Sequence, residues 1–331
     1  MHIANWILLL TYFYPAADLE QVTASFHLTS DRPAKGEVAV SYPYDAVIYN
    51  DLIYVSDYYH RILVFSAEEL QNQWGVIGEG PGEMKHPPTR LNVDQGAIVV
   101  TEMYGWQRHF FTPKGTYLRR EALDRQAIQV GQDQFRKLVF EEAVYLGSRY
   151  RNDENQCLLS RLEDASEVAF HVSEALLLAR KSGFIVVKRS GPIETYDQRC
   201  RLQKTFSLPV EFFKKKMQKD PIRTKIASKV QTLSPIQYYQ YGLPIIDAEL
   251  EGDSNLWILV SDENVENEQR KPELVHLYRV DLTTGQPDLK VRLPEPANRI
   301  RISNHHLVLV ATEYATVRAY SLRALDSLAK K

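Results

Sequence analysis

The sequence predicts an all-β fold, a six-bladed β-propeller. Short runs of β-branched and aromatic residues flank a polar corner in residues 52–65, and a glycine- and proline-rich connector follows at 78–87. Related runs return after about 45 residues, which is the length of one propeller blade. A chain of 331 residues holds six such blades as one domain, and its 19 Tyr and 12 Phe supply apolar surface for neighbouring blades to bury.

The first two blades have the clearest strands. In the first blade, residues 43–74, one strand ends with the sequence YVSD at 54–57, and the next has the sequence RILVF at 61–65. Both strands combine β-branched and aromatic residues, which favour the extended conformation. The second blade, residues 91–120, repeats them at 97–102 and 109–112.

These motifs resemble the repeats of the NHL-type six-bladed β-propellers. Such repeats combine a strand ending in Val-x-Asp, an Arg-Ile-x-Val-Phe strand and a Gly-x-Gly-Pro-Gly-x-Phe-x-x-Pro connector. In this chain the connector spans residues 78–87, and Met84 takes the place of the usual aromatic residue. The match covers about residues 43–120. It implies that the later blades follow the same plan, and that corners and connectors form a funnel at one end of the central channel.

The remaining blades are expected in chain order. We predict that residues 22–28 form a strand that joins the last blade and so closes the ring, because a shared strand removes an open seam between the first and last blades. Strands are expected at 143–146 and 157–159 in the third blade, at 175–178, 184–187, 193–196 and 204–208 in the fourth, at 255–260 and 289–293 in the fifth, and at 299–303, 307–312 and 316–321 in the sixth.

One segment interrupts the strand pattern between the fourth and fifth blades. Residues 209–240 carry clustered lysines, with apolar residues at helical spacing, so we expect a short helical insertion there. We favour an amphipathic cover packed on a blade edge. The alternative is a docking surface for an anionic partner or for membrane headgroups.

The amino terminus has features of an export signal. Residues 6–14 are apolar, and Pro15, Ala16 and Ala17 follow, so residues 1–17 are interpreted as a signal peptide and residues 18–331 as the propeller domain. The protein is then exported, whether periplasmic, secreted or surface-associated. The residues before the apolar run include no Lys or Arg, so a cytoplasmic location is the alternative. No segment reaches the roughly 20 apolar residues that a membrane-spanning helix needs.

Charge and cysteine content exclude several classes of protein. A formal net charge of -2 gives no broad positive face for nucleic acid. The two cysteines, Cys157 and Cys200, are too few for a disulfide framework and lack the spacing of a metal site, so we interpret both as structural, with a bridge as the alternative.

Ligand-binding residues are expected at the funnel, because loops on a rigid scaffold carry recognition. Aromatic rings beside charged groups suit a ligand with an apolar face and polar handles, such as a peptide or a sugar. Asp57 and Arg61 are expected to fasten their own corner instead. The candidate ligand-binding residues are Tyr58, Tyr59, His60, His86, Glu102, Tyr104, Trp106, Arg108, Arg189, Asp262, Glu313 and Tyr314.

The sequence favours a non-catalytic binding propeller without a cofactor, recognising a peptide, glycan or protein partner. The alternative is a metal-dependent hydrolase or lyase of the lactonase-like propeller type, with a divalent ion such as calcium held by Glu102, Asp262 and Glu313. Convergence of His60, His86 and His109 on a metal ion is disfavoured, because they lack a short paired spacing. The motifs of those enzyme families do not surround the carboxylates, and fold alone does not establish an activity.

Overall fold

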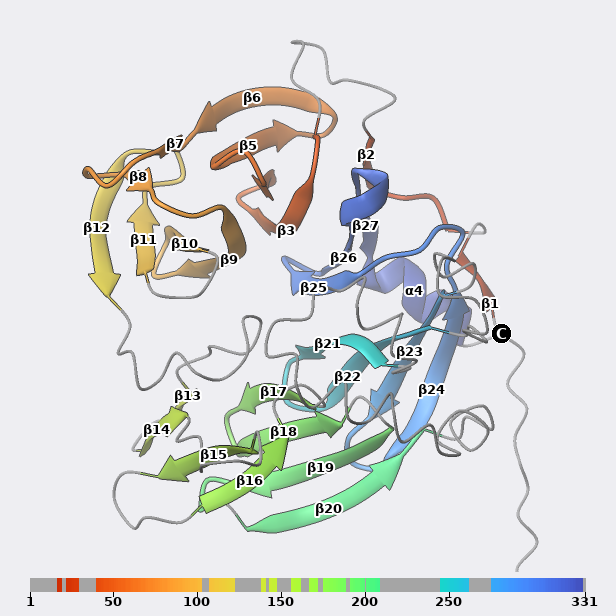
Figure 1. Ribbon diagram of the computed structural model, residues 1–331. Helices are drawn as coiled ribbons and strands as arrows, with labels where there is room; N and C mark the ends of the chain where they lie inside the picture. Colours follow the sequence, from red (N-terminus) through yellow and green to blue (C-terminus); the bar gives the residue numbers. More distant parts are fainter. Residues whose placement is uncertain are drawn as a thin grey trace, which may run out of the picture.

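In its described residues, the computed structural model is an all-β ring of sheets with one short α-helix that follows the last strand (Figure 1). Residues 17–19, 22–29, 40–102, 107–122, 138–140, 143–147, 156–161, 167–171, 175–188, 191–199, 201–208, 245–261 and 275–329 are described.

The first two sheets are four-stranded and antiparallel, each in the order of the chain. A parallel ribbon of two short strands connects them. The strands are β3 (Pro43–Tyr49), β4 (Leu52–Asp57), β5 (Arg61–Ser66) and β6 (Glu69–Trp74), then β7 (Val76–Ile77) and β8 (Glu83–Met84) of the ribbon, and then β9 (Pro88–Asp94), β10 (Ala97–Glu102), β11 (Gln107–Phe111) and β12 (Tyr117–Ala122).

The third and fourth sheets have the same form. Their strands are β13 (Leu138–Phe140), β14 (Ala143–Gly147), β15 (Gln156–Arg161) and β16 (Glu167–His171), followed by β17 (Ala175–Arg180), β18 (Gly183–Lys188), β19 (Pro192–Asp197) and β20 (Leu202–Ser207).

Two further sheets complete the ring, and each takes a strand from the amino-terminal segment. The first contains β21 (Ile245–Glu251), β22 (Asn255–Ser261), β23 (Val275–Asp281) and β24 (Gln286–Arg292), with β1 (Ala17–Asp18) beside β24. The second contains β25 (Arg299–Ser303), β26 (His306–Ala311) and β27 (Thr316–Ser321), with β2 (Phe26–Thr29) beside β27. The 3₁₀-helix η3 (Thr312–Tyr314) and the helix α4 (Leu322–Ala329) flank β27.

The prediction of a six-bladed propeller is wrong. Among the described residues, five sheets are four-stranded and antiparallel, whereas the sheet of β21–β24 has β1 as a fifth strand that runs parallel to β24. The structure therefore has five blades of the predicted four-stranded kind rather than six. No sequence pattern predicts this difference, because a strand of two residues is too short to show any hydrophobic periodicity.

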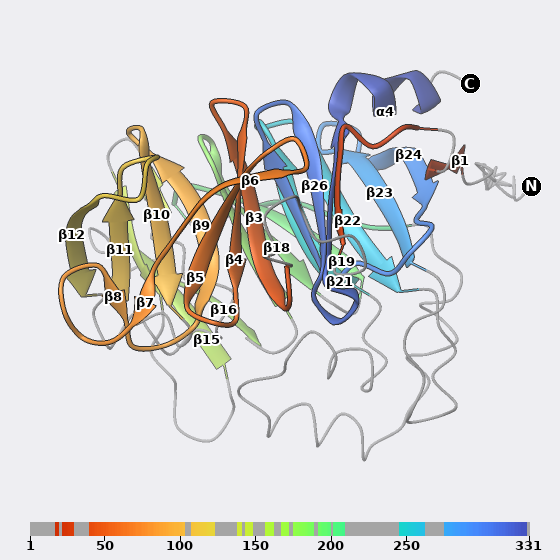
Figure 2. The ribbon, with the colours of Figure 1, turned by 90° about the horizontal axis from the view of Figure 1, so that it is seen from above.

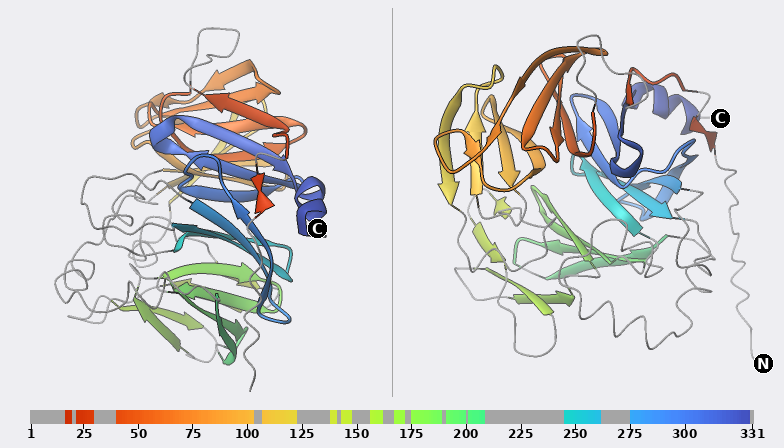
Figure 3. Two further views of the ribbon diagram at one scale, coloured as in Figure 1. Left: turned by 90° about the vertical axis from the view of Figure 1, so that its right-hand side faces the viewer. Right: turned by 45° about the horizontal axis from the view of Figure 1, so that its top comes forward.

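The predicted amino-terminal strand closes the last blade, although it spans Phe26–Thr29 rather than residues 22–28. Phe26 pairs with Ala319 and Leu28 with Val317, in antiparallel register. Phe26 and Leu28 are buried while His27 and Thr29 are partly exposed, so the alternation of the sequence matches the two faces of the strand. Figure 3 shows β2 beside β27 and this sheet between β3–β6 and β21–β24.

The ring follows the order of the chain, as Figure 1 shows from orange through green to blue. The first strand of each sheet lies nearest the centre, and β3 contacts both β9 and β25, while β25 also contacts β21. The second strands are buried on both faces because a neighbouring sheet covers each side; Ile98, Val99 and Val100 of β10 are examples. The fourth strands β6, β12 and β20 are largely exposed.

Two-residue turns join the first and second strands in three sheets. Asn50 and Asp51, Gln95 and Gly96, and Asn304 and His305 all have positive φ. Two successive left-handed residues make the turn whose twist matches a β-hairpin. These three turns therefore lie at one end of the channel, and the corners between second and third strands lie at the other.

Helix α4 lies at one end of the ring, above β23 and β24 in Figure 2, and contacts both β24 and β27. Its Leu322, Leu325 and Leu328 are buried in one cluster with Val291 and Leu19. Within the described residues, no helix combines the length and the apolar character needed to cross a bilayer.

Several predictions fall outside the described residues. The lysine-rich segment 209–240, most of the expected signal peptide 1–17, and Cys200 are among them. Cys157 lies on β15.

Candidate functional site

Charged residues on the innermost strands face the channel. Three of these strands, β9, β21 and β25, alternate polar and apolar residues, as in Asp247-Ala248-Glu249 of β21 and Arg299-Ile300-Arg301 of β25. Because successive side chains of a strand point to opposite faces, the charged members of each strand share one face. The alternation therefore brings charges from several sheets together at the centre of the ring.

Three of these residues form a buried cluster, which we call the ion-pair belt: Asp45, Glu249 and Arg301. The Nε and Nη2 atoms of Arg301 donate to the Asp45 carboxylate over 2.8 and 2.6 Å. Arg301 Nη1 donates to Glu249 Oε2 over 3.1 Å, and Nη2 also donates to the carbonyl of Leu91 over 2.9 Å. One guanidinium thus joins β3, β9, β21 and β25.

The charged groups of the belt are satisfied by one another and by the neighbouring backbone. Asp45 is fully buried, and its carboxylate also accepts from the backbone N–H of Leu91 over 2.8 Å. Burial alone would raise the pKa of Asp45, but the charge and hydrogen bonds of Arg301, with the charges of Arg299 and Arg90, outweigh it and hold that pKa below its ordinary value. Burial would likewise lower the pKa of Arg301, yet Asp45 and Glu249 raise it. Both groups stay charged, with their hydrogen-bonding groups engaged by protein.

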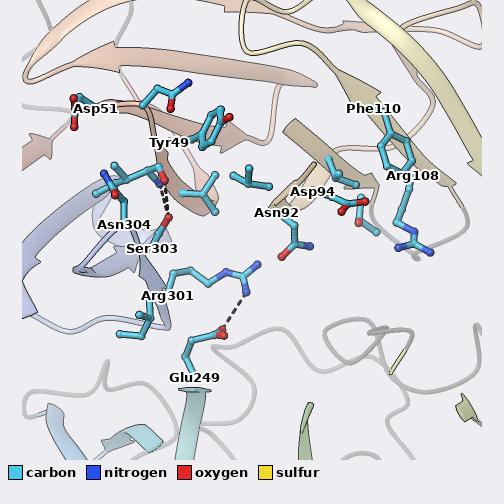
Figure 4. Close-up of a pocket in the computed structure, with 17 residues that line it drawn as sticks. Tyr49, Asp51, Asn92, Asp94, Arg108, Phe110, Glu249, Arg301, Ser303 and Asn304 are labelled. Atoms are coloured by element: carbon cyan, nitrogen blue, oxygen red, sulfur yellow. Dashed lines mark hydrogen bonds and ion pairs between the residues drawn. The ribbon is translucent and has the colours of Figure 1, made fainter. Parts of the chain in front are cut away.

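A cavity of about 880 Å³ lies beside the belt (Figure 4). Its walls come from the carboxyl-terminal halves of β3, β9 and β25, from the turns after β3 and β25, and from one face of β10 and β11. Arg301 and Glu249 of the belt line it, together with Asn92, Asp94 and Arg108. This volume is in the range of small-molecule sites.

A second candidate site lies at the opposite end of β3, where four tyrosines cluster. We call it the tyrosine corner: Tyr42, Tyr44, Tyr58 and Tyr59. Ring centroids are 5.6 Å apart for Tyr42 and Tyr44, 5.9 Å for Tyr42 and Tyr58, and 5.8 Å for Tyr58 and Tyr59. Tyr58 is 47% exposed and Tyr59 62% exposed. The guanidinium of Arg61 lies 5.6 Å from the centroid of the Tyr59 ring.

Asp57 holds this corner in shape. Its fully buried carboxylate accepts from the backbone N–H of Ser41 over 3.0 Å, from that of Tyr59 over 3.2 Å, and from Arg61 Nη2 over 3.3 Å. The expected structural role of Asp57 and Arg61 is thereby confirmed. The tyrosines are thus displayed on a fixed backbone.

Histidines and Glu102 gather at the seam between the first two blades. The buried Glu102 Oε1 accepts from His109 Nε2 over 2.7 Å and from the backbone N–H of Lys85 over 3.1 Å. Burial lowers the pKa of His60; a hydrogen bond with the backbone of Lys85 and the charge of Glu102 oppose this, and His86 adds to the lowering. The predicted His60, His86 and Glu102 therefore lie near one another.

The other predicted ligand residues divide into four groups. Tyr58 and Tyr59 belong to the tyrosine corner, and Arg108 lines the cavity. Tyr314 is an exposed residue at the end of η3, to which Glu313 contributes its backbone. Tyr104, Trp106, Arg189 and Asp262 lie outside the described residues.

The metal-site alternative rested on Glu102, Asp262 and Glu313. Glu102 is bound by His109 and Lys85. No group of three or more His, Cys, Asp or Glu in the part of the chain that the structure describes is placed to hold a metal ion.

The sequence analysis missed Tyr42, Tyr44 and the ion-pair belt. Tyr42 and Tyr44 precede and begin β3, so they come next to Tyr58 only through the pairing of Pro43 with Asp57. Part of the signal for the belt was present, because β21 and β25 carry charges at alternate positions where an ordinary core strand would have apolar residues.

Comparisons with known proteins agree on the fold. No family model and no curated protein matches the sequence. A member of the DUF4221 family from Bacteroides vulgatus matches with a TM-score of 0.53 and 7% identity, over 91% of this chain and 97% of that one. BBS1N in its complex with ARL6DN matches with a TM-score of 0.50 and 11% identity, over 91% and 96%. The Pan2 WD40 domain of Neurospora crassa matches with a TM-score of 0.46 and 7% identity, over 90% and 94%. At these identities the likeness concerns the fold alone.

Proposed function

We propose that this propeller is a non-catalytic binding protein that recognises a peptide segment of a partner protein at the tyrosine corner. The observation that carries the proposal is the contiguous, exposed cluster of Tyr58 and Tyr59 with Tyr42 and Tyr44 behind them. Tyrosines supply large contact area with little loss of side-chain freedom, and they are enriched among the residues that dominate binding energy.

The angles between the rings favour a peptide over a sugar. Tyr42 and Tyr44 are inclined by 77°, Tyr42 and Tyr58 by 74°, and Tyr58 and Tyr59 by 82°. Rings in edge-to-face contact present an uneven surface with grooves between them, whereas a sugar ring or a base stacks best on one open aromatic face. Apolar side chains of an extended peptide fit such grooves.

The setting of the corner supports the same function. Asp57 fixes the backbone beneath the tyrosines, so binding needs little ordering of the site itself. Arg61 pairs with Asp57 and lies beside the Tyr59 ring, which adds one polar contact at the edge of the apolar surface. BBS1N, whose fold is similar, is found in complex with ARL6DN, so a domain of this form can bind a protein.

We also infer an NHL-like repeat for the first blade and its connector. In the connector, Gly82 has a φ of +81°, and Met84, in the place of the usual aromatic residue, is fully buried between the first two blades. The export expected from residues 1–17 and the docking role considered for residues 209–240 remain predictions.

The test is selection of peptides from a displayed random library on the intact protein, followed by calorimetric titration of the enriched peptide. We expect the Y58A/Y59A double variant to bind that peptide at least about tenfold more weakly, since dominant interface tyrosines contribute more than 1 kcal/mol each. The control is L118A, because Leu118 is also about half exposed but lies on β12, away from the corner.

Two results would overturn the proposal. One is a library that yields no common peptide, or a peptide whose affinity the double variant leaves unchanged. The other is binding of an oligosaccharide on a glycan array that depends on Tyr58 and Tyr59, which would replace the peptide by a sugar.

A further inference from the structure

The channel cavity has no role in the peptide binding proposed above. It lies toward the turn after β3, whereas the tyrosine corner lies where β3 begins. Its lining combines apolar side chains, such as Val47, Val99 and Phe110, with amide, hydroxyl and charged groups. A concave surface that combines apolar side chains with a few polar groups is characteristic of small-molecule sites.

The two arginines among the described lining residues differ in whether their hydrogen-bond donors already have acceptors. Arg301 is buried, and its guanidinium donates to Asp45, to Glu249 and to the carbonyl of Leu91. Arg108 has no hydrogen bond or ion pair within the described residues, and its buried Nε meets no acceptor there. A buried donor left without an acceptor costs about 1–3 kcal/mol, so a ligand that supplies one gains that energy.

The strand pattern directs Arg108 into the cavity. On β11, Arg108 and Phe110 share the face that lines the cavity, while His109 and Phe111 face the first blade. Figure 4 shows the Arg108 side chain extending into the open space below Phe110 and Asp94. Thr101, its register partner on β10, lines the same wall.

We propose that the cavity binds a small molecule that carries one carboxylate, with Arg108 as its main recognition residue. A guanidinium offers two parallel N–H donors that match the two oxygens of a carboxylate. The apolar part of the ligand lies against Phe110 and Val99, and the Asn92 amide and Thr101 hydroxyl are available to polar substituents.

The acidic lining residues restrict the class of ligand. Asp51, Asp94 and Glu249 also line the cavity, and Glu249 is already paired with Arg301. A second carboxylate on the ligand would meet like charge, whereas an ammonium group would be attracted to Asp94. The ligand class is therefore a monocarboxylate, either with or without an amino group.

The experiment compares matched probes in thermal melting and calorimetric titration of the whole chain. The probes are 3-phenylpropionate, its uncharged amide, L-phenylalanine, phenylsuccinate as a dicarboxylate, and a panel of aliphatic monocarboxylates and amino acids. We expect at least one monocarboxylate to raise the melting temperature, since a ligand that binds the folded state stabilises it, and its amide to have no effect. A stronger response to L-phenylalanine than to 3-phenylpropionate would identify the zwitterion as the ligand.

Substitution of Arg108 ties the response to this residue. R108Q should weaken binding of the responding carboxylate by about tenfold to a hundredfold, since a hydrogen bond to a charged group contributes about 1.5–3 kcal/mol. R108K keeps the positive charge but lacks the two parallel N–H donors of the guanidinium, so it should retain part of the affinity. The matched control is R120Q on β12, where the exposed Arg120 donates to the carbonyl of Glu79 over 3.2 Å and does not line the cavity.

Three outcomes would overturn the proposal. They are equal binding of acid and amide, an unchanged affinity in R108Q, and no shift of the melting temperature with any monocarboxylate of the panel. Because these probes do not involve the tyrosine corner, Y58A/Y59A should respond to them as the unmodified protein does, which separates this proposal from the peptide site.

Discussion

The ion-pair belt and the tyrosine corner adjoin one another on β3, through Asp45 and Tyr44, yet they use polar chemistry in opposite ways. Arg301 in the belt is buried and held by four strands, with acceptors on each side of its guanidinium. Tyr58 and Tyr59 in the corner are about half exposed, and their rings contact each other and the other tyrosines of the corner. The belt therefore stabilises the ring, and the corner is available to a partner. Charge in a channel does not by itself mark a binding site; what matters is whether the polar groups already have partners.

The largest expected effect follows from removing the cation of the belt. R301M leaves the Asp45 carboxylate buried without its counter-charge, which should lower the free energy of unfolding by about 3–5 kcal/mol. Denaturant titration measures this. The double variant D45N/R301M should recover part of the loss, because it removes the uncompensated charge. A loss below about 1 kcal/mol in R301M would contradict the structural role of the belt.

Acidification tests the same belt without a substitution. The pKa of Asp45 is lower in the folded than in the unfolded protein, so its contribution to stability is complete above the ordinary aspartate pKa of 3.8 and is lost as the pH falls through the folded value. Stability should therefore decrease below that pH. In D45N the decrease should be smaller, and an identical pH profile for D45N and the unmodified protein would count against this assignment.

A smaller effect is expected at the edge of the belt. E249Q keeps an acceptor for Arg301 Nη1 but removes the charge, and Asp45 still neutralises the guanidinium. The expected loss of stability is about 1 kcal/mol. Denaturant titration of E249Q and R301M compares the two losses of stability. A loss in E249Q equal to that in R301M would contradict the smaller contribution expected of Glu249.

The smallest effect on stability should come from the tyrosine corner. Y58A/Y59A removes exposed rings and leaves the Asp57 hydrogen bonds in place, so the change in unfolding free energy should stay within about 0.5 kcal/mol per residue. Thermal melting is sufficient to measure it. A loss comparable to that of R301M would place these tyrosines in the core and remove the contrast between the two regions.

The sequence predicted local strands better than their assembly. Short runs of β-branched and apolar residues located β4, β10 and β26, which are buried on both faces, and alternation of apolar and polar residues located the closing strand β2. The two-residue strand β1 has no such pattern, so the sequence did not predict how many blades are four-stranded.

For the candidate sites the limit was tertiary proximity. Tyr58 and Tyr59 were found because they sit in a recognisable corner, but their partners Tyr42 and Tyr44 come from before the paired strand. Arg108 was expected at the funnel, yet only the structure distinguishes it from Arg301, whose donors are engaged by residues more than 200 positions away. Contacts between residues so far apart in the sequence produce no local sequence pattern.

The attachment of β1 and β2 to two different sheets has a consequence for biosynthesis. These strands are made before the other sheets, whereas their partners β24 and β27 are made after most of them. Until β27 has been made, β2 exposes unpaired backbone groups and the apolar side chains of Phe26 and Leu28. The ring therefore cannot close before β27 is synthesised, and a nascent chain arrested earlier would expose an unpaired strand edge to which chaperones or neighbouring chains could bind.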